Sequence, residues 1–403
     1  MLHGGSRING GEAGGFRAHG SSKIANVTRK QLKHSRKWNY PVWLCVTLAA
    51  FPWSLSKSQV KQTPGADSSF NERLEAGIAL ARKGDLKGAE GAFAQAVMVR
   101  PQDPRALTAL GQVQEQLGRV TESIEKFRRV VGIDPLSSEA HVNLGIALGD
   151  HTELGPALEE SVTAIRLSPG LADAHFLRGR LLNDLGKHED ARSEFRKVLE
   201  INPEYAEAFE YLAALDGDEG NRVEQANSLR RYLKLRPKQA TAWFQLGQIL
   251  IEESRKSEAI AAWRRAVAIN PQYSAAIYSL GRALKETDPA ESKRILDRFR
   301  EIEEDQQAID RVNMLGNQAN LKMYDANYKG AIEDLKNAIV ICGSCKLLGA
   351  LEKNLGLAYC HAGQLDSGER ELKIAESLIP EEPSVIAALQ TVNQQRVQAL
   401  DGR

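Results

Sequence analysis

Six prolines recur at a fixed spacing through the middle of the chain. Each lies 34 residues after the one before it, and together they are Pro101, Pro135, Pro169, Pro203, Pro237 and Pro271. A fixed period of this length is typical of stacked supersecondary units, each of which buries its apolar face only against its neighbours. Proline lacks a backbone N–H and its ring clashes with the preceding helical turn, so each of these residues predicts the end of a helix. We therefore expect a chain of repeated helical units.

Other residue types recur in step with the prolines. When each proline takes position 32 of its repeat, repeats 1 to 6 begin at Phe70, Pro104, Ser138, Ala172, Ala206 and Ala240. Glycine is frequent at position 8, a small residue at position 20, a large apolar residue at position 24, and Ala or Val at position 27. Small residues at positions 8 and 20 allow two antiparallel helices to approach closely, and the large residue at position 24 fills the space between neighbouring hairpins.

These residues at this spacing resemble the tetratricopeptide repeat family. The resemblance covers residues 70–382 and implies an all-α fold, an α-solenoid of about nine 34-residue antiparallel helix hairpins with a C-terminal capping helix. Repeats 1–7 take up residues 70–303, degenerate repeats 8 and 9 take up residues 304–382, and residues 383–403 form the capping helix and tail. Repeats 7, 8 and 9 begin at Ser274, Val312 and Gly349.

The repeat pattern is weakest at residues 284–311. The turn of repeat 7 is shortened around the sequence KETDPAES, and Asp305 stands where the next proline is due. The pattern predicts a long or kinked helix here. Its expected buried side comprises Ile295, Phe299, Ile302, Ile309 and Val312.

The first 69 residues lie before the repeats. Residues 1–37 are Gly-rich and basic and predict disorder, residues 38–58 predict a signal peptide or N-terminal anchor, and residues 59–69 predict a linker. The apolar run Val42–Leu55 contains Pro52 and is shorter than the roughly 20 residues of a spanning helix. Its basic flank predicts export of the remainder to the periplasm or the exterior, or anchoring on the outer side of the cytoplasmic membrane. An apolar run without targeting function, in a cytoplasmic protein, stays open as the alternative.

Charge is distributed unevenly along the chain. Residues 1–58 hold nine Lys and Arg and one acidic residue, which leaves 44 basic and 51 acidic residues in the rest, a net charge of −7. Binding to phosphates requires clustered cations, so this acidic body argues against nucleic acid as a partner. A membrane is expected as a partner only through an uncleaved N-terminal anchor.

No catalytic, cofactor-binding or metal-binding motif stands out. His141 and His175 occupy position 4 of adjacent repeats, where packing is favoured over metal binding because no third ligand lies at a suitable spacing. The acidic turn DGDEGN at residues 216–221 lacks the glutamate and glycine positions of a calcium loop, which favours a solvated turn. We therefore predict a protein that is not an enzyme.

The family resemblance implies a concave groove lined by the first helix of each repeat, at positions 2, 5, 6, 9, 12 and 13. The predicted groove contacts are Phe176, Arg180, Tyr211, Phe244, Gln248, Tyr278 and Arg282. Such side chains suit an extended peptide or a partner helix, although some of the aromatic rings could instead pack against a neighbouring helix. The resulting prediction is a protein–protein interaction scaffold of the cell envelope.

The sequence VICGSC holds a pair of closely spaced cysteines, Cys342 and Cys345, in the connection between repeats 8 and 9. This pair predicts a disulfide clip on the connection, while reduced thiols or a thiol-redox function stay open as alternatives. A helix beginning near Ser344 would place Cys342 at a helix N-terminus, where its thiol pKa would fall. Cys360 is too distant to pair with Cys345 and is expected to be a lone thiol.

Overall fold

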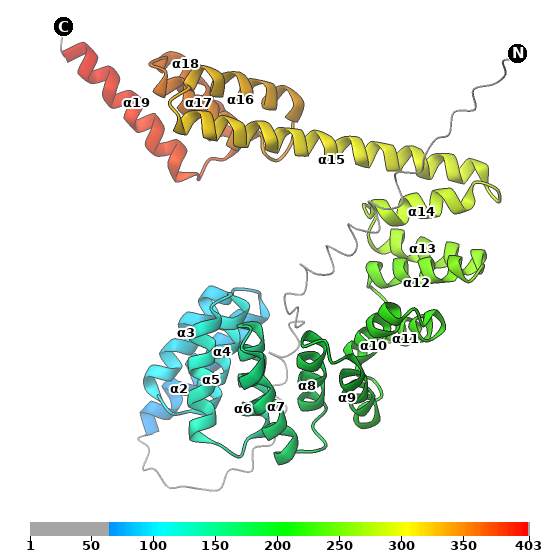
Figure 1. Ribbon diagram of the computed structural model, residues 1–403. Coiled ribbons are helices and arrows are strands. Elements are labelled where there is room, and N and C mark those ends of the chain that lie inside the picture. Colours follow the sequence, from blue (N-terminus) through cyan, green and yellow to red (C-terminus); the bar gives the residue numbers. More distant parts are fainter. Residues whose placement is uncertain (1–63, 402–403) are drawn as a thin grey trace, which may run out of the picture. The chain divides into compact units, whose positions relative to one another are not determined.

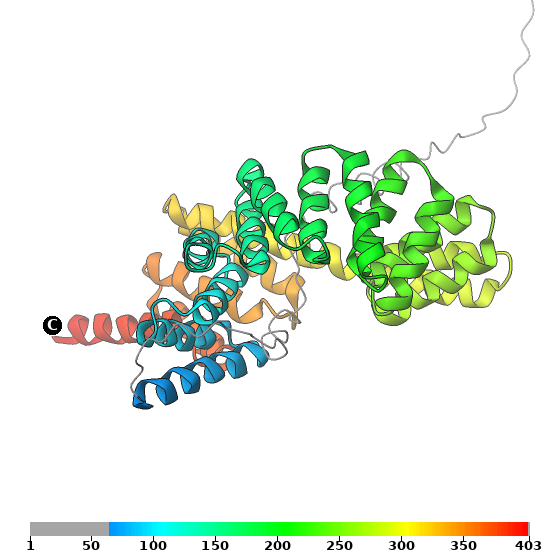
Figure 2. The same cartoon turned by 90° about the horizontal axis from the view of Figure 1, so that it is seen from below.

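The computed structural model describes residues 64–401, and their side chains from residue 68 to residue 395. These residues form eighteen α-helices and, within this range, no strand (Figures 1 and 2). The predicted all-α repeat solenoid is therefore confirmed. The predicted disordered segment 1–37 and the predicted signal peptide or anchor 38–58 lie outside the described residues.

The described helices divide between two compact units, with the boundary in the chain after Ser228. The N-terminal unit holds α2 (Pro64–Arg82), α3 (Leu86–Val99), α4 (Pro104–Gln116), α5 (Val120–Ile133), α6 (Ser138–Asp150), α7 (Leu154–Leu167), α8 (Ala172–Asp184), α9 (His188–Ile201) and α10 (Ala206–Glu219). Helix α11 (Arg222–Leu235) carries the chain from one unit to the next. The C-terminal unit continues with α12 (Ala240–Glu252), α13 (Lys256–Ile269), α14 (Ser274–Leu284), α15 (Pro289–Tyr324), α16 (Tyr328–Cys342), α17 (Leu348–His361), α18 (Leu365–Leu378) and α19 (Pro383–Asp401).

Each repeat is a hairpin whose two helices pack through the predicted small positions. In repeat 2, the ring of Phe127 at position 24 lies directly over Gly111 at position 8, and Phe127 is only 1% exposed. A Cβ added to Gly111 would lie 2.9 Å from Cε1 of that ring, which is closer than real Cβ contacts. Position 20 is equally tight, since Ala89 and Ser123 are fully buried. The close approach of the two helices is therefore the reason for glycine at position 8.

The turn between the two helices of a repeat uses a left-handed residue at position 15. Eight repeats have a positive φ there, between 57° and 82°: Gly84, Gly118, Thr152, Gly186, Gly220, Ser254, Ala326 and Gly363. Left-handed backbone is strained for residues with a Cβ, which accounts for glycine in five of the eight. Repeat 7, whose turn is shortened, is the repeat without this feature, since Asp288 has a φ of −146°.

Helix α2 begins earlier than the sequence predicts. The predicted linker ends at residue 69, but the helix already starts at Pro64. Proline is well tolerated in the first turn of a helix, where its missing N–H would have no intrahelical partner. The end of the predicted linker is therefore helical.

The degenerate region contains one continuous helix, α15, of 36 residues. It joins the second helix of repeat 7 to the first helix of repeat 8, as Figure 1 shows, with α14 beside its beginning and α16 beside its end. Val312 is buried as predicted, but Ile309 is 40% exposed, so its predicted place on the buried side is wrong. The residue lies between the part that packs on α14 and the part that packs on α16.

The acidic turn of repeat 5 is only partly solvated. Helix α10 extends through Glu219, and Asp216 within it is 4% exposed and paired with the guanidinium of Arg192 from α9. A second nitrogen of Arg192 lies 2.8 Å from Glu219. The expectation of a solvated turn is therefore wrong for Asp216, because a buried arginine neutralises it.

Candidate functional site

The first helices of successive repeats lie on one side of the N-terminal unit. Helix α6 contacts α8 directly, although α7 separates them in the chain and packs on both. The groove positions predicted in this unit belong to α8 and α10, namely Phe176, Arg180 and Tyr211. Those predicted in the C-terminal unit belong to α12 and α14, namely Phe244, Gln248, Tyr278 and Arg282.

Two of the predicted aromatic contacts are buried. Phe176 is 5% exposed, and its ring centroid lies 4.9 Å from that of Tyr205 and 5.5 Å from that of Tyr211. Phe244 is 4% exposed and its centroid lies 5.1 Å from that of Tyr273. Both rings therefore pack against neighbouring helices, which is the alternative that the sequence left open.

Arg180 is buried as well, at 7% exposed, and the remaining four predicted contacts are accessible to different extents. Tyr211, Gln248 and Tyr278 are half-buried, and Arg282 is exposed. The guanidinium of Arg282 lies 5.7 Å from the centre of the Tyr278 ring, within cation–π range. A ligand contact through these four side chains stays a prediction.

A charged cluster that the sequence analysis overlooked lies on the same side of the N-terminal unit. It combines Glu115 of α4, Asp150 of α6, and Arg180 and Asp184 of α8. Three acceptor oxygens there, Gln112 Oε1, Glu115 Oε1 and Asp150 Oδ1, are buried and have no hydrogen-bond partner. Buried acceptors of this kind are costly unless a donor reaches them. Glu115 and Asp150 are only partly buried as residues, so other parts of their side chains are accessible from outside.

Burial changes the protonation of the two cluster carboxyls. Burial raises the pKa of Glu115 from its ordinary value of 4.5 to about 7, although the positive charge of Arg180 acts in the opposite direction. Burial also raises the pKa of Asp150 to about 8, and the charges of Glu115 and Asp184 raise it further, against the effect of Arg180. Near pH 7 both carboxyl groups are therefore protonated in a substantial fraction of molecules, and an approaching cation would favour their charged forms.

The repeat register contained the signal for this cluster. Gln112, Glu115, Asp150, Arg180 and Asp184 occupy positions 9, 12 or 13 of repeats 2, 3 and 4, all of which face the predicted groove. Reading every groove position of repeats 2 to 4, and not only their aromatic residues, would have placed these charges together.

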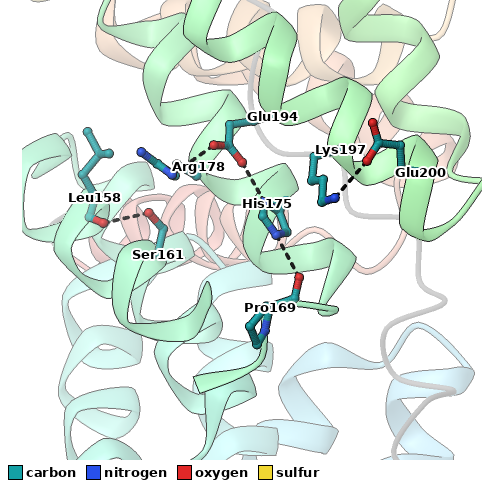
Figure 3. A network of polar contacts seen from close by, with 8 residues as sticks. All are labelled: Leu158, Ser161, Pro169, His175, Arg178, Glu194, Lys197 and Glu200. Atoms are coloured by element: carbon teal, nitrogen blue, oxygen red, sulfur yellow. Dashed lines mark hydrogen bonds and ion pairs between the residues drawn. The ribbon is translucent and has the colours of Figure 1, made fainter. Parts of the chain in front are cut away.

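The two histidines at position 4 have a structural role. Nε2 of His175 lies 3.1 Å from the carbonyl oxygen of Pro169, and Nδ1 lies 2.7 Å from Glu194 Oε2 (Figure 3). His141 makes the same two contacts one repeat earlier, with Pro135 and Glu160. Both ring nitrogens are thus engaged in tying the start of a first helix to the second helix of its repeat. Within the described residues, no group of three or more His, Cys, Asp or Glu side chains could hold a metal ion.

The two cysteines of the inter-repeat connection are joined by a disulfide, with their Cα atoms 5.1 Å apart. Helix α16 ends at Cys342, and α17 begins only at Leu348. The expectation that Cys342 stands at a helix N-terminus is therefore wrong, because it occupies a C-terminus, where the dipole disfavours a thiolate. Cys360 is unpaired, and burial raises the pKa of its thiol. The thiol-redox alternative gains no support from this arrangement.

Family comparison agrees with the repeat geometry. One tetratricopeptide repeat model matches residues 74–138 and 211–274, and another matches residues 172–205. The chain is a tetratricopeptide repeat protein. The family fold is associated with protein–protein interaction. Among curated proteins, no sequence shows a significant match to this chain.

Several solved structures of tetratricopeptide repeat proteins share local similarity with this chain. MamA is 27% identical over 41% of this chain and 96% of its own, with a TM-score of 0.35. A thermophilic repeat protein from Thermus thermophilus is 24% identical over 45% of this chain and 99% of its own, with a TM-score of 0.41. PilW, a type IV pilus biogenesis factor, is 18% identical over 55% of this chain and 100% of its own, with a TM-score of 0.47.

None of the tetratricopeptide helices between residues 64 and 401 is long and apolar enough to cross a membrane.

Proposed function

We propose that this tetratricopeptide repeat protein is a non-enzymatic scaffold of the cell envelope that binds segments of other proteins along its first helices. The observation that carries the proposal is the side of α4, α6 and α8, where the partly exposed acids Glu115 and Asp150 lie close enough to interact with each other and with Asp184. Carboxyl oxygens accept hydrogen bonds from N–H donors and attract positive charge, so a segment with Lys or Arg side chains fits this surface best. Tyr211 is accessible on the first helix α10 of the N-terminal unit. Within the C-terminal unit, Gln248, Tyr278 and Arg282 offer contacts of their own on α12 and α14.

The envelope location is supported by the sequence alone. The basic segment followed by the apolar run Val42–Leu55 has the order of an export signal, and this run lies outside the described residues. Cell fractionation combined with sequencing of the mature N-terminus tests this part. A cytoplasmic protein that retains its N-terminus would contradict it.

Binding is tested with an array of peptides that differ only in Lys, Arg, acetyl-lysine or citrulline at one position. We expect the intact chain to retain the Lys and Arg peptides, and retention to fall at least tenfold in the double variant Glu115→Gln/Asp150→Asn. The matched control is Glu122→Gln, an exposed acid on the second helix α5. Equal retention of charged and neutralised peptides would contradict the proposed function.

A further inference from the structure

Positions 3 and 10 of a first helix are buried wherever a second helix precedes it in a regular junction. In repeats 2 to 7, both positions are no more than 8% exposed. Position 3 there is Ala106, Ala140, Ala174, Ala208, Ala242 and Ala276, and position 10 is Val113, Ala147, Leu181, Leu215, Ile249 and Ala283. The reason is direct packing, since Ala106 clusters with Ala96 of α3, and Ala140 with Val130 of α5.

In repeat 1, no described helix precedes the first helix. Helix α2 is the first described helix, and its positions 3 and 10, Glu72 and Ala79, are both exposed. A polar or small residue is the expected choice for a surface that meets water. Positions 3 and 10 therefore report whether a second helix lies in front of a repeat.

Repeat 8 combines apolar residues with an uncovered surface. Its positions 3 and 10 are Met314 and Leu321, which are 50% and 66% exposed. The same positions of repeat 9, Leu351 and Ala358, are 6% and 0% exposed. Repeat 8 thus has apolar residues at positions 3 and 10, like the repeats that a preceding second helix covers, but no described helix packs over them.

The continuity of α15 explains the uncovered surface. The segment that would cover repeat 8 is the second helix of repeat 7, which here is the first half of α15 and cannot fold back on its second half (Figure 1). That first half is also incompletely covered. Leu296 and Phe299 at positions 24 and 27 are only half-buried, whereas these positions are at most 6% exposed in the other repeats. Gly281 fixes this register, because Leu296 is the side chain that faces it.

We propose that a second copy of this chain completes the junction, with the first half of each α15 packed against the second half of the other. The two uncovered surfaces lie on the first and the second half of α15. In an ordinary repeat junction these two surfaces pack on each other, so the first half in one copy can cover the second half in the other. Exchange of identical elements is a low-cost route to a symmetric dimer, particularly where a connecting turn is replaced by straight helix. The two copies of α15 run antiparallel, as the two helices do at a closed junction.

The repeat register specifies which residues meet. Position 27 packs on position 3 of the next repeat in the regular junctions, so Phe299 of one copy faces Met314 of the other. With Phe299 opposite Met314, the two-fold axis passes between Gln306 and Gln307.

Light scattering of the full chain tests the assembly. We expect twice the mass of one chain for the native protein and the mass of one chain for Met314→Glu/Leu321→Glu. Met98→Glu is the matched control, since Met98 is 78% exposed on α3, and it should remain dimeric. A native chain that stays monomeric over the accessible concentration range would overturn the proposal, and so would a dimer that survives the double substitution.

Cysteine and proline variants test the same interface without removing its apolar side chains, so a folding defect in the double variant would not decide the outcome. Gln307→Cys should form an intermolecular disulfide between identical residues, mapped by mass spectrometry. Gln318→Cys should not, because residue 318 lies about 17 Å further along the helix, away from the two-fold axis. Asp305→Pro restores the missing helix end and should shift the dimer toward monomer by letting the junction close within one chain. Absence of the Gln307 cross-link in a dimeric protein would reject this interface and point to another one.

Discussion

The replacement of Glu115 by glutamine gives the sharpest test of the buried charge cluster. The carboxyl group is largely buried and its pKa is raised from 4.5 to about 7 by burial, with Arg180 acting in the opposite direction. A group whose pKa is raised in the folded state stabilises the fold below its unfolded pKa, and this contribution is lost as the pH rises through the folded value. The affected window therefore runs from about pH 4.5 to beyond pH 7.

The magnitude follows from the shift. A difference of about 2.5 pKa units corresponds to roughly 3 kcal/mol of folding free energy between the two ends of the window. Glutamine has the shape of the protonated acid but cannot ionise. We therefore expect Glu115→Gln to leave stability nearly unchanged at pH 4.5 and to raise the free energy of unfolding by up to about 3 kcal/mol at pH 9.

The assay must report on the N-terminal unit, because repeat arrays often unfold in parts. Amide hydrogen exchange in α4 and α6, followed at pH 5, 7 and 9, measures local opening there, after correction for the intrinsic exchange rate at each pH. The control Glu122→Gln changes an exposed acid and should show no such pH dependence. Equal effects of Glu115→Gln at pH 5 and pH 9 would refute the reasoning.

Three further predictions concern the repeats themselves. Ser254→Gly should raise the free energy of unfolding by about 1 kcal/mol, seen as a higher melting temperature, because Ser254 has a left-handed backbone with a φ of 61° that glycine adopts without strain. A lower melting temperature would contradict this prediction. Gly111→Ala should lower the free energy of unfolding by about 1–3 kcal/mol, measured by urea denaturation, since the added methyl group would clash with the ring of Phe127. An unchanged urea midpoint would contradict this prediction, because it would mean that the ring moves aside at no cost. Arg192→Met should cost about 3–5 kcal/mol because it leaves Asp216 buried without its cation; the additional change Asp216→Asn should recover part of that loss, measured in a double-mutant cycle.

Much of the local structure was predictable from the repeat period. The small residues at positions 8 and 20 act within one hairpin, so a single repeat already carries that information. The aromatic residue at position 24 also packs on the next repeat, as Phe195 does on Tyr211. Position 15 was missed although glycine occupies it in most repeats, and a full tabulation of the repeats would have found it. The start of α2 was missed because nothing in the period describes a helix that extends before the first repeat.

The candidate site was less predictable. Phe176 was expected to face a ligand, but whether its ring points to the groove or into the core depends on Tyr205 and Tyr211, which come from the next repeat. The cluster of Glu115, Asp150 and Arg180 draws on three different repeats. Each residue alone looks like an ordinary charged side chain on a helix, and only their shared burial changes their chemistry.

By itself, the sequence determined the number and spacing of the hairpins, because helix ends and close-packing residues are local signals that recur every 34 residues. The tertiary structure decided which charges are desolvated together and that the junction between repeats 7 and 8 is a straight helix. The physical reason is that burial and cover depend on neighbours from other repeats. Met314 and Leu321 have the same apolar character in either case, and only the path of α15 leaves them exposed.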